Sequence, residues 1–158
     1  MTQTVKQADM KTLPIVWQRL VKDGETCGRC GSTREAVVAA LAKLEATLRP
    51  LGIQPVLATR VLDEAAFAAD PSASNRIWIA GKPLEEWLGA SVGASPCCSV
   101  CGDLPCRTLE VAGTSFEAIP EDLIVKATLI AAARMIEPTH AQAAPPACCT
   151  GSCDTACG

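Results

Sequence analysis

Apolar and polar residues alternate along the first half of the chain with the spacings of strands and of one long helix. Runs rich in β-branched residues at 13–20 and 53–62 predict two strands, and a shorter run at 77–79 predicts a third. Between the first two runs, a helix is predicted from Ser32 until Pro50. The apolar residues on its predicted buried face are Val37, Leu41, Leu44 and Leu48. A helix that joins two such strands makes them parallel neighbours, so this part of the chain predicts a β-α-β unit.

The second half of the chain carries weaker signals that complete an α/β order. Asp63 is expected to cap a short helix, and residues 84–88 are expected to form a helical turn. No element is predicted for the stretch 89–95, which is rich in Gly, Ser and Ala. A hairpin at 107–119 and a last helix at 120–136 follow, the helix starting at a proline, which is favoured in the first helical turn. Together these elements predict a central mixed sheet flanked by helices, with a cysteine-rich insert.

Length and composition suit one domain with an aliphatic core. The 158 residues fall in the usual range for a single domain. Because 49% of them are hydrophobic and only 3% are aromatic, the core must be built mostly from aliphatic side chains. We expect an N-terminal extension at 1–12, one α/β domain at 13–137 and a flexible, cysteine-rich tail at 138–158, where Pro, Ala and Gly dominate.

Charge and hydropathy argue against two classes of partner. The net charge is −3 and the basic residues are scattered singly from Lys6 to Arg134, so no nucleic-acid-binding surface is expected. Charges near the N-terminus leave no apolar region for a signal peptide, and no apolar run approaches the length of a membrane span. We therefore expect a cytoplasmic protein without membrane insertion. In a reducing cytosol, clustered cysteines are more often metal-binding or catalytic than structural disulfides.

Ten cysteines in three tight groups are the most specific chemical feature of the sequence. A disulfide-stapled domain would spread its cysteines, because bridges that close long loops stabilise the fold most. The groups are Cys27 and Cys30; Cys97, Cys98, Cys101 and Cys106; and Cys148, Cys149, Cys153 and Cys157. Such clustering indicates thiolates that act together, either in the two-electron redox chemistry of a dithiol or in binding a soft metal ion.

The first group lies where the first predicted strand leads into the first predicted helix. Unpaired N–H groups and the macrodipole favour a thiolate at a helix start, so Cys27 is expected to be the nucleophile and Cys30 the resolving thiol. Arg29 and Arg34 add positive potential beside them. A C-x-x-C motif next to a β-α-β unit is typical of thioredoxin-like domains. A buried pair of thiols and two ligands of a structural zinc stay open as alternatives.

The second and third groups have different settings. In the second group Gly102 permits a tight turn, and four cysteines suffice for a tetrahedral zinc site. Structural zinc, a functional soft-metal or redox site, and a chance cluster all stay open. The third group lies on a tail with little apolar bulk, so its thiols are expected to capture and pass on a thiophilic ion. His140 is expected to be solvated, as are Glu85 and Glu86 on a helix face.

Two resemblances follow from particular segments. GETCGRCGSTREAV, SNRIWIAGKPLEEWLG, SPCCSVCGDLPCRTLEV and FEAIPEDLIVKA resemble, in motif order, an uncharacterised bacterial family known as domain of unknown function 2703. That resemblance implies a thioredoxin-like fold for residues 13–136. The vicinal cysteines after a proline-rich linker resemble the ends of arsenic metallochaperones, which are also thioredoxin-like and pass trivalent arsenic or antimony to an efflux ATPase. This second resemblance implies arsenic or heavy-metal resistance and an efflux partner.

Three functions stay open on the sequence alone. The first is a thioredoxin-like protein that binds or relays As(III), Hg(II), Cu(I) or Zn(II) through the second and third cysteine groups, with Cys27 and Cys30 as a redox or transfer dithiol. The second is a thiol-disulfide oxidoreductase in which Cys27 attacks and Cys30 resolves, working with a redox partner protein. The third is a zinc-stabilised interaction module.

Overall fold

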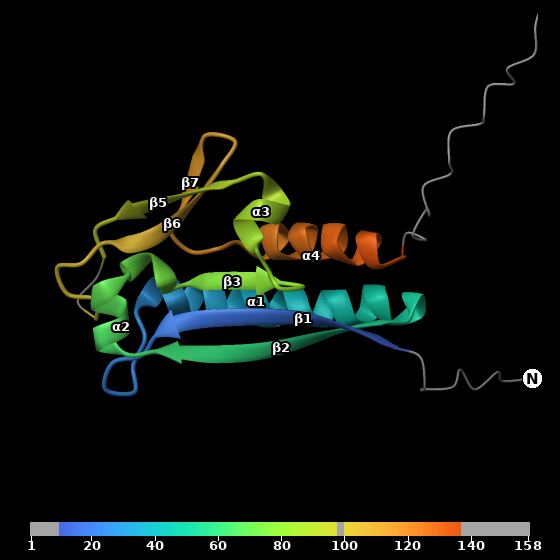
Figure 1. Cartoon of the computed structure of the whole chain (residues 1–158), viewed down its shortest axis with the longest axis horizontal. Coiled ribbons are helices and arrows are strands. Elements are labelled where there is room, and N and C mark those ends of the chain that lie inside the picture. The colour runs from blue at the N-terminus through green and yellow to red at the C-terminus, as the bar shows by residue number, and fades with distance from the viewer. Residues whose placement is uncertain (1–9, 98–99, 137–158) are drawn as a thin grey trace, which may run out of the picture.

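Strand β1, Lys11–Leu20, is a central strand of the structure. The computed structural model describes residues 10–97 and 100–136 of the chain (Figure 1). Along β1 the side chains of Leu13, Ile15 and Trp17 are buried, and the residues between them are exposed or half-buried. This period of two turns one face of the strand toward the core, as the apolar alternation predicted.

β1 belongs to a mixed sheet of four strands in the order β2-β1-β3-β4. β2, Ile53–Leu62, runs parallel to β1 along its whole length, which confirms the predicted β-α-β unit. β3, Arg76–Ile79, and β4, Lys82–Pro83, extend the sheet by antiparallel pairing. The α/β class and the mixed sheet predicted from the sequence are therefore confirmed.

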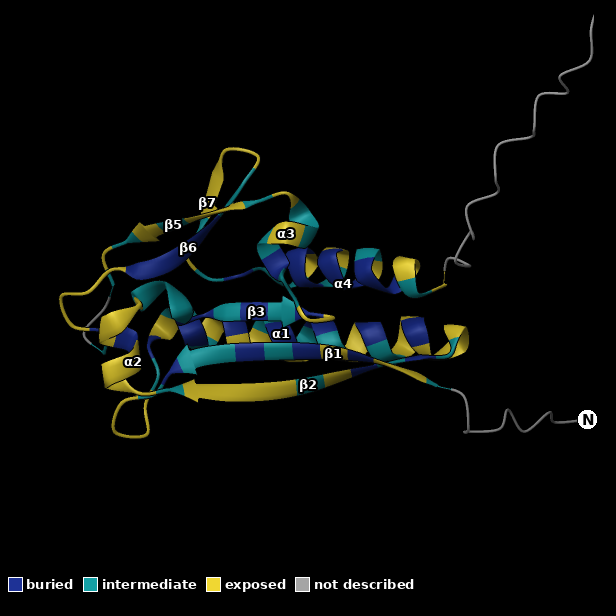
Figure 2. Ribbon diagram, in the orientation of Figure 1, coloured by how far each residue is buried: buried dark blue, intermediate teal, exposed yellow. Residues whose placement is uncertain are grey.

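Two long helices pack against each other and contact this sheet (Figures 1 and 2). α1, Gly28–Leu48, contacts β2, and α4, Glu121–Ile136, contacts β3. The side chains that α1 buries include Val37, Ala40, Leu44 and Leu48, whereas the predicted Leu41 is half-buried. Lys11 Nζ donates a hydrogen bond of 3.0 Å to the carbonyl of Met135, so the end of α4 lies beside the start of β1.

Short helical elements fill the connections. The 3₁₀ turn η1, Arg49–Leu51, ends α1 close to the predicted stop. α2, Glu64–Ala69, begins at Asp63, whose carboxylate accepts a hydrogen bond of 2.8 Å from the Ala66 amide, so the predicted cap is confirmed. The 3₁₀ turn η2, Pro71–Ala73, leads into β3, and α3, Leu84–Leu88, matches the predicted helical turn.

A second, antiparallel sheet is built from three strands in the order β5-β6-β7. β5 is Ser91–Ser95, β6 is Cys106–Val111 and β7 is Thr114–Phe116. The hairpin of β6 and β7 was predicted, but β5 falls in the stretch for which no element was expected. Gly93 suits the pairing of β5 with β6, because a Cβ there would lie 2.6 Å from Thr108 Oγ1 and would force the neighbouring side chains to shift. The cysteine-rich insert connects β5 to β6.

The structure describes most of the predicted domain but not the predicted tail. Cys98, His140 and the four tail cysteines Cys148, Cys149, Cys153 and Cys157 lie outside the described residues. Among the helices that the structure does describe, none is both long and apolar enough to cross a membrane.

Candidate functional site

Helix α1 begins at the C-x-x-C motif itself. Its first helical residue is Gly28, four positions before the predicted start at Ser32, and Cys27 is the N-cap residue with an extended backbone. Cys30 consequently lies in the first turn of the helix and is buried. The amides of Arg29 and Cys30, which have no partner within the helix, are among the groups that lower the pKa of the Cys27 thiol. The expected position of the dithiol at a helix start is thus found in the structure.

The pKa values of the two thiols are shifted in opposite directions. A hydrogen bond from the Cys30 side chain is the largest of the contributions that lower the pKa of Cys27 to about 5. The amides of Cys30 and Arg29 and the Cys101 side chain lower this pKa further, and together with the Cys30 side chain they outweigh the burial that raises it. The same bond to Cys27, together with burial and the nearby thiolate charge, raises the pKa of Cys30. At neutral pH the pair is therefore a Cys27 thiolate and a Cys30 thiol.

The buried side chain of Cys30 contacts two groups, Cys27 and a residue shortly before β3. Its sulfur lies 3.8 Å from the hydroxyl oxygen of Ser74, a buried residue shortly before β3. Ser74 also accepts a hydrogen bond of 3.0 Å from the amide of Leu20, at the end of β1. The hydroxyl therefore ties the end of β1 to the dithiol, and it is one of the groups that lower the pKa of Cys30 against the larger upward effects.

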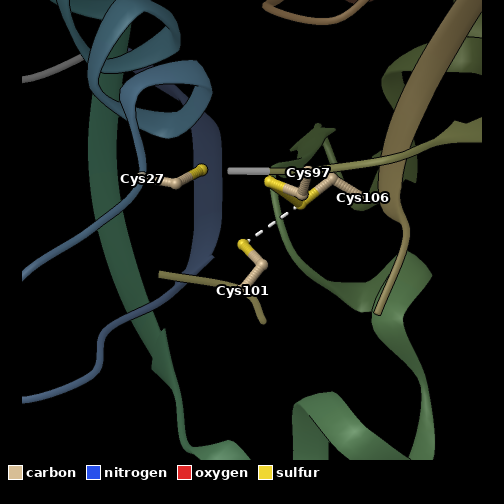
Figure 3. A group of neighbouring side chains, drawn as sticks. All are labelled: Cys27, Cys97, Cys101 and Cys106. Atoms are coloured by element: carbon tan, nitrogen blue, oxygen red, sulfur yellow. Dashed lines mark hydrogen bonds between the residues drawn. A yellow bond between two sulfur atoms is a disulfide. The ribbon is translucent and has the colours of Figure 1, made fainter. Parts of the chain in front are cut away.

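Four sulfur atoms from different parts of the chain meet at this helix start (Figure 3). The sulfurs of Cys27, Cys97, Cys101 and Cys106 all lie within 4.8 Å of one another; we call them the four-sulfur cluster. Cys97 is half-buried, and the other three cysteines are buried. Their convergence joins the first cysteine group to the second, which their positions in the sequence did not indicate.

The cluster contains a disulfide between Cys97 and Cys106, whose Cα atoms are 5.3 Å apart. The sulfur of Cys101 lies 3.1 Å from that of Cys106. In Figure 3 the side chain of Cys27 points from the start of α1 toward the disulfide, and Cys101 approaches from a third direction. Cys30 lies beside Cys27 but outside the four-sulfur cluster.

Arg29 fastens the segment that carries Cys97 to the start of α1. Its guanidinium donates hydrogen bonds of 2.8 Å to Ser95 Oγ, 2.6 Å to the Pro96 carbonyl and 2.7 Å to Glu117 Oε1. Ser95 ends β5 and Glu117 follows β7, so one side chain binds both edges of the second sheet. The sequence suggested only that Arg29 adds positive potential; its contacts give it a positioning role.

A buried ion pair holds the other side of the cluster. Arg107, which follows Cys106 on β6, places its guanidinium 2.6 Å from the carboxylate of Glu85 on α3. The two side chains are 5% and 13% exposed, so the expectation that Glu85 is solvated was wrong. Arg107 also donates a hydrogen bond of 3.1 Å to the carbonyl of Ser72. The strand that carries Cys106 is thereby fixed to both α3 and η2.

A cavity reaches the cluster from one side. Its volume is about 420 Å³, and Leu20, Phe67, Val100, Cys101 and Leu104 are among the residues that line it. Cys101 therefore belongs both to the cluster and to the wall of a mostly apolar cavity. A small ligand in this cavity would therefore contact Cys101.

The donor set suits a soft cation when it is reduced. Four cysteine sulfurs are the ligand set of tetrahedral zinc sites, and thiolates generally select soft ions. While Cys97 and Cys106 form a disulfide, neither sulfur is a thiolate, so the cluster can hold an ion only after that bond is broken. Metal chemistry and disulfide chemistry therefore compete for the same atoms.

Comparisons with known proteins bear on the family. The pattern of the family described as "Domain of unknown function (DUF2703)" matches residues 13–128. A protein named "Uncharacterized protein" from the archaeon Archaeoglobus fulgidus is 44% identical over 112 residues, which cover 71% of this chain and 82% of that protein. No solved structure matches the chain.

Proposed function

The chain belongs to the family described as Domain of unknown function (DUF2703), and we propose that it binds a thiophilic metal or metalloid ion through the reduced four-sulfur cluster. The observation that carries this proposal is the approach of four cysteine sulfurs to within 4.8 Å of one another. The ion is cargo in this proposal, delivered to the cluster and passed on from it.

The surroundings of the cluster favour ion binding in its reduced state. Cys27 supplies a thiolate at neutral pH, because its pKa is lowered to about 5. Burial of Cys27, Cys101 and Cys106 excludes water, which strengthens the attraction between thiolates and a cation. Softness of the ligands favours Cu(I), Zn(II), Hg(II) and As(III) over hard cations. We infer that the ion belongs to this class.

The cysteine-rich tail is proposed to deliver the ion. α4 ends beside the start of β1, where Lys11 bonds to Met135, whereas the cluster lies near the end of β1. Ten strand residues span about 30 Å, and the twelve residues from Ile136 to Cys148 can reach about 40 Å when extended. Chain length thus permits Cys148 and Cys149 to meet the cluster in the same molecule.

The fold that we propose is thioredoxin-like. Support comes from the sheet order β2-β1-β3-β4 and from a dithiol placed between β1 and the start of α1. A second function, thiol-disulfide oxidoreductase, is favoured by one observation, the disulfide next to the acidic Cys27 thiol. In that function Cys27, whose pKa is lowered, attacks as a thiolate, and Cys30, whose pKa is raised, resolves the mixed disulfide.

Ion binding is tested by titrating fully reduced protein with arsenite, Hg(II), Cu(I) and Zn(II) without oxygen. Full-length protein with the four tail cysteines replaced by serine should still bind one equivalent of at least one of these ions. Cys27→Ser and Cys101→Ser in that background should weaken binding, whereas Cys30→Ser should not. Equal affinity in all these variants would show that the ion lies elsewhere. Zinc that survives purification and raises the melting temperature would favour a zinc-stabilised module instead.

A further inference from the structure

We propose that Cys27 and Cys30 reduce the Cys97–Cys106 disulfide within the same molecule, so that the disulfide moves to the Cys27–Cys30 pair. This exchange goes beyond ion binding, and it needs no ion. It would make the oxidation state of one dithiol decide whether Cys97 and Cys106 are available as ligands.

Position supports attack by Cys27 on the disulfide. Its sulfur lies within 4.8 Å of both disulfide sulfurs, and its side chain points toward them (Figure 3). Thiol-disulfide exchange requires a thiolate as attacking group, and Cys27 is the N-cap residue of α1, where unpaired amides and the helix macrodipole favour a thiolate. Arg29 holds the segment just before Cys97 against the first turn of α1, so the two reacting sulfurs are kept together.

The first step forms one bond and breaks one. The Cys27 thiolate attacks the sulfur of Cys97, the Cys27–Cys97 bond forms, and the Cys97–Cys106 bond breaks with its electron pair on Cys106. The leaving sulfur is 3.1 Å from the sulfur of Cys101, close enough for a hydrogen bond that stabilises a thiolate. Cys101 can therefore stabilise Cys106 as the leaving thiolate.

The second step completes the transfer. Cys30, which is hydrogen-bonded to Cys27, gives up its proton and attacks the sulfur of Cys27, and the bond to Cys97 breaks. The proton passes to one of the two released sulfurs. Overall, two sulfurs of the dithiol are oxidised and two sulfurs of the former disulfide are reduced, so charge and electrons balance without an outside oxidant or reductant. Ser74, 3.8 Å from Cys30, helps to stabilise the attacking thiolate.

Exchange would change the ligands that an ion finds. Before it, Cys97 and Cys106 are bonded to each other and cannot bind. After it, Cys97 and Cys106 are reduced beside Cys101, while Cys27 is held in the new disulfide. An ion would then meet three sulfurs, and a fourth only after an external dithiol has reduced the Cys27–Cys30 pair.

Tryptic cleavage sites make the exchange readable. Arg29 separates Cys27 from Cys30, so peptides 23–29 and 30–34 each carry one cysteine of the dithiol. Peptide 77–107 carries the whole second group, because Lys82 precedes a proline and is not cleaved. Every disulfide in the exchange therefore gives a different peptide or peptide pair.

The experiment supplies reduced full-length protein with one equivalent of diamide, in the presence of a chelator and without oxygen. Samples are quenched with acid at increasing times, thiols are blocked with N-ethylmaleimide, and tryptic peptides are identified by mass spectrometry. In the wild type, the disulfide within 77–107 should decline as the link between 23–29 and 30–34 appears. In Cys27→Ser the disulfide within 77–107 should persist.

Cys30→Ser tests the exchange most directly. It blocks the second step, so the mixed disulfide between Cys27 and Cys97 should accumulate. Peptide 23–29 should be found linked to 77–107 in this variant and in Cys30→Ala, which guards against a folding defect in either one. If both variants retain the wild-type circular dichroism and give no such link, intramolecular exchange is refuted. Since no ion is present, that result would leave the proposed ion binding untouched.

Discussion

The sulfur of Cys27, at the amino end of α1, lies within 4.8 Å of the sulfur of Cys106, the first residue of β6. The two residues belong to different layers of the fold, one leading out of the four-stranded sheet and the other opening the three-stranded sheet. Their approach joins a helix-start dithiol to a disulfide, and the contacts around it determine the following predictions.

The half-buried Arg29 should matter more for the cluster than an exposed arginine on the same helix. Arg29→Ala removes three hydrogen bonds between α1 and the second sheet, two of them to neutral acceptors. We expect urea unfolding to show a loss of about 1–2 kcal/mol, and the mixed disulfide of Cys30→Ser to form more slowly in the double variant.

Arg34→Ala is the matched control, since Arg34 is exposed on the same helix. It should change the free energy of unfolding by no more than about 0.5 kcal/mol. Equal effects of the two substitutions would show that Arg29 does not position Cys97.

The acidity of Cys27 should be visible in the ultraviolet absorbance of its thiolate. The difference between wild type and Cys27→Ser should titrate with a midpoint at about pH 5. Cys30→Ala should move that midpoint upward, because the Cys30 side chain provides the largest contribution that lowers the pKa. A wild-type midpoint near the ordinary thiol value of about 8.5 would contradict the geometry of the helix start.

The free energy of unfolding should change with pH as Cys27 titrates. A thiol in the unfolded chain binds its proton below about pH 8.5, whereas folded Cys27 remains a thiolate down to about pH 5. Between these values the unfolded state holds the extra proton, so the contribution of Cys27 is complete above this window and is lost as the pH falls through it. Wild type and Cys27→Ser should therefore differ in the pH dependence of urea unfolding over this window; parallel profiles would argue against a thiolate.

Loss of the buried ion pair between Glu85 and Arg107 should destabilise the fold more than loss of the exposed pair beside it. Glu85→Gln leaves the Arg107 guanidinium buried without its carboxylate, which should lower the free energy of unfolding by about 3 kcal/mol. Glu86→Gln removes only an exposed pair with Lys82 and should cost less than about 0.5 kcal/mol. Thermal unfolding of both variants checks this difference, and similar melting temperatures would contradict it.

Sequence patterns predicted the main strands of the first sheet well, because these strands are marked by residues that are neighbours in the sequence. The apolar alternation of β1, the β-branched run of β2 and the cap at Asp63 are properties of neighbouring residues, and the structure confirms each of them. β5 could not be predicted in the same way. Its residues are small and have no apolar alternation, and its extended form is set by pairing with β6.

The site was predictable in its parts but not in its assembly. The helix start at Gly28 was placed too late, because Gly28 and Gly31 lack the apolar side chains that mark a helical face. Both cysteine groups were recognised, yet spacing along the chain could not show that Cys27 meets Cys101 in space. The role of Glu85 was missed for the same reason, since its partner Arg107 is distant in the sequence.

X-ray absorption of the Zn(II)-loaded, fully reduced protein tests the convergence of Cys27, Cys97, Cys101 and Cys106 most directly. With the four tail cysteines replaced by serine, zinc should have four sulfur neighbours at about 2.3 Å. Cys27→Ser in that background should leave three, and Cys30→Ser should leave four. A sulfur count that does not respond to Cys27→Ser would contradict a single ion site shared by the first two cysteine groups.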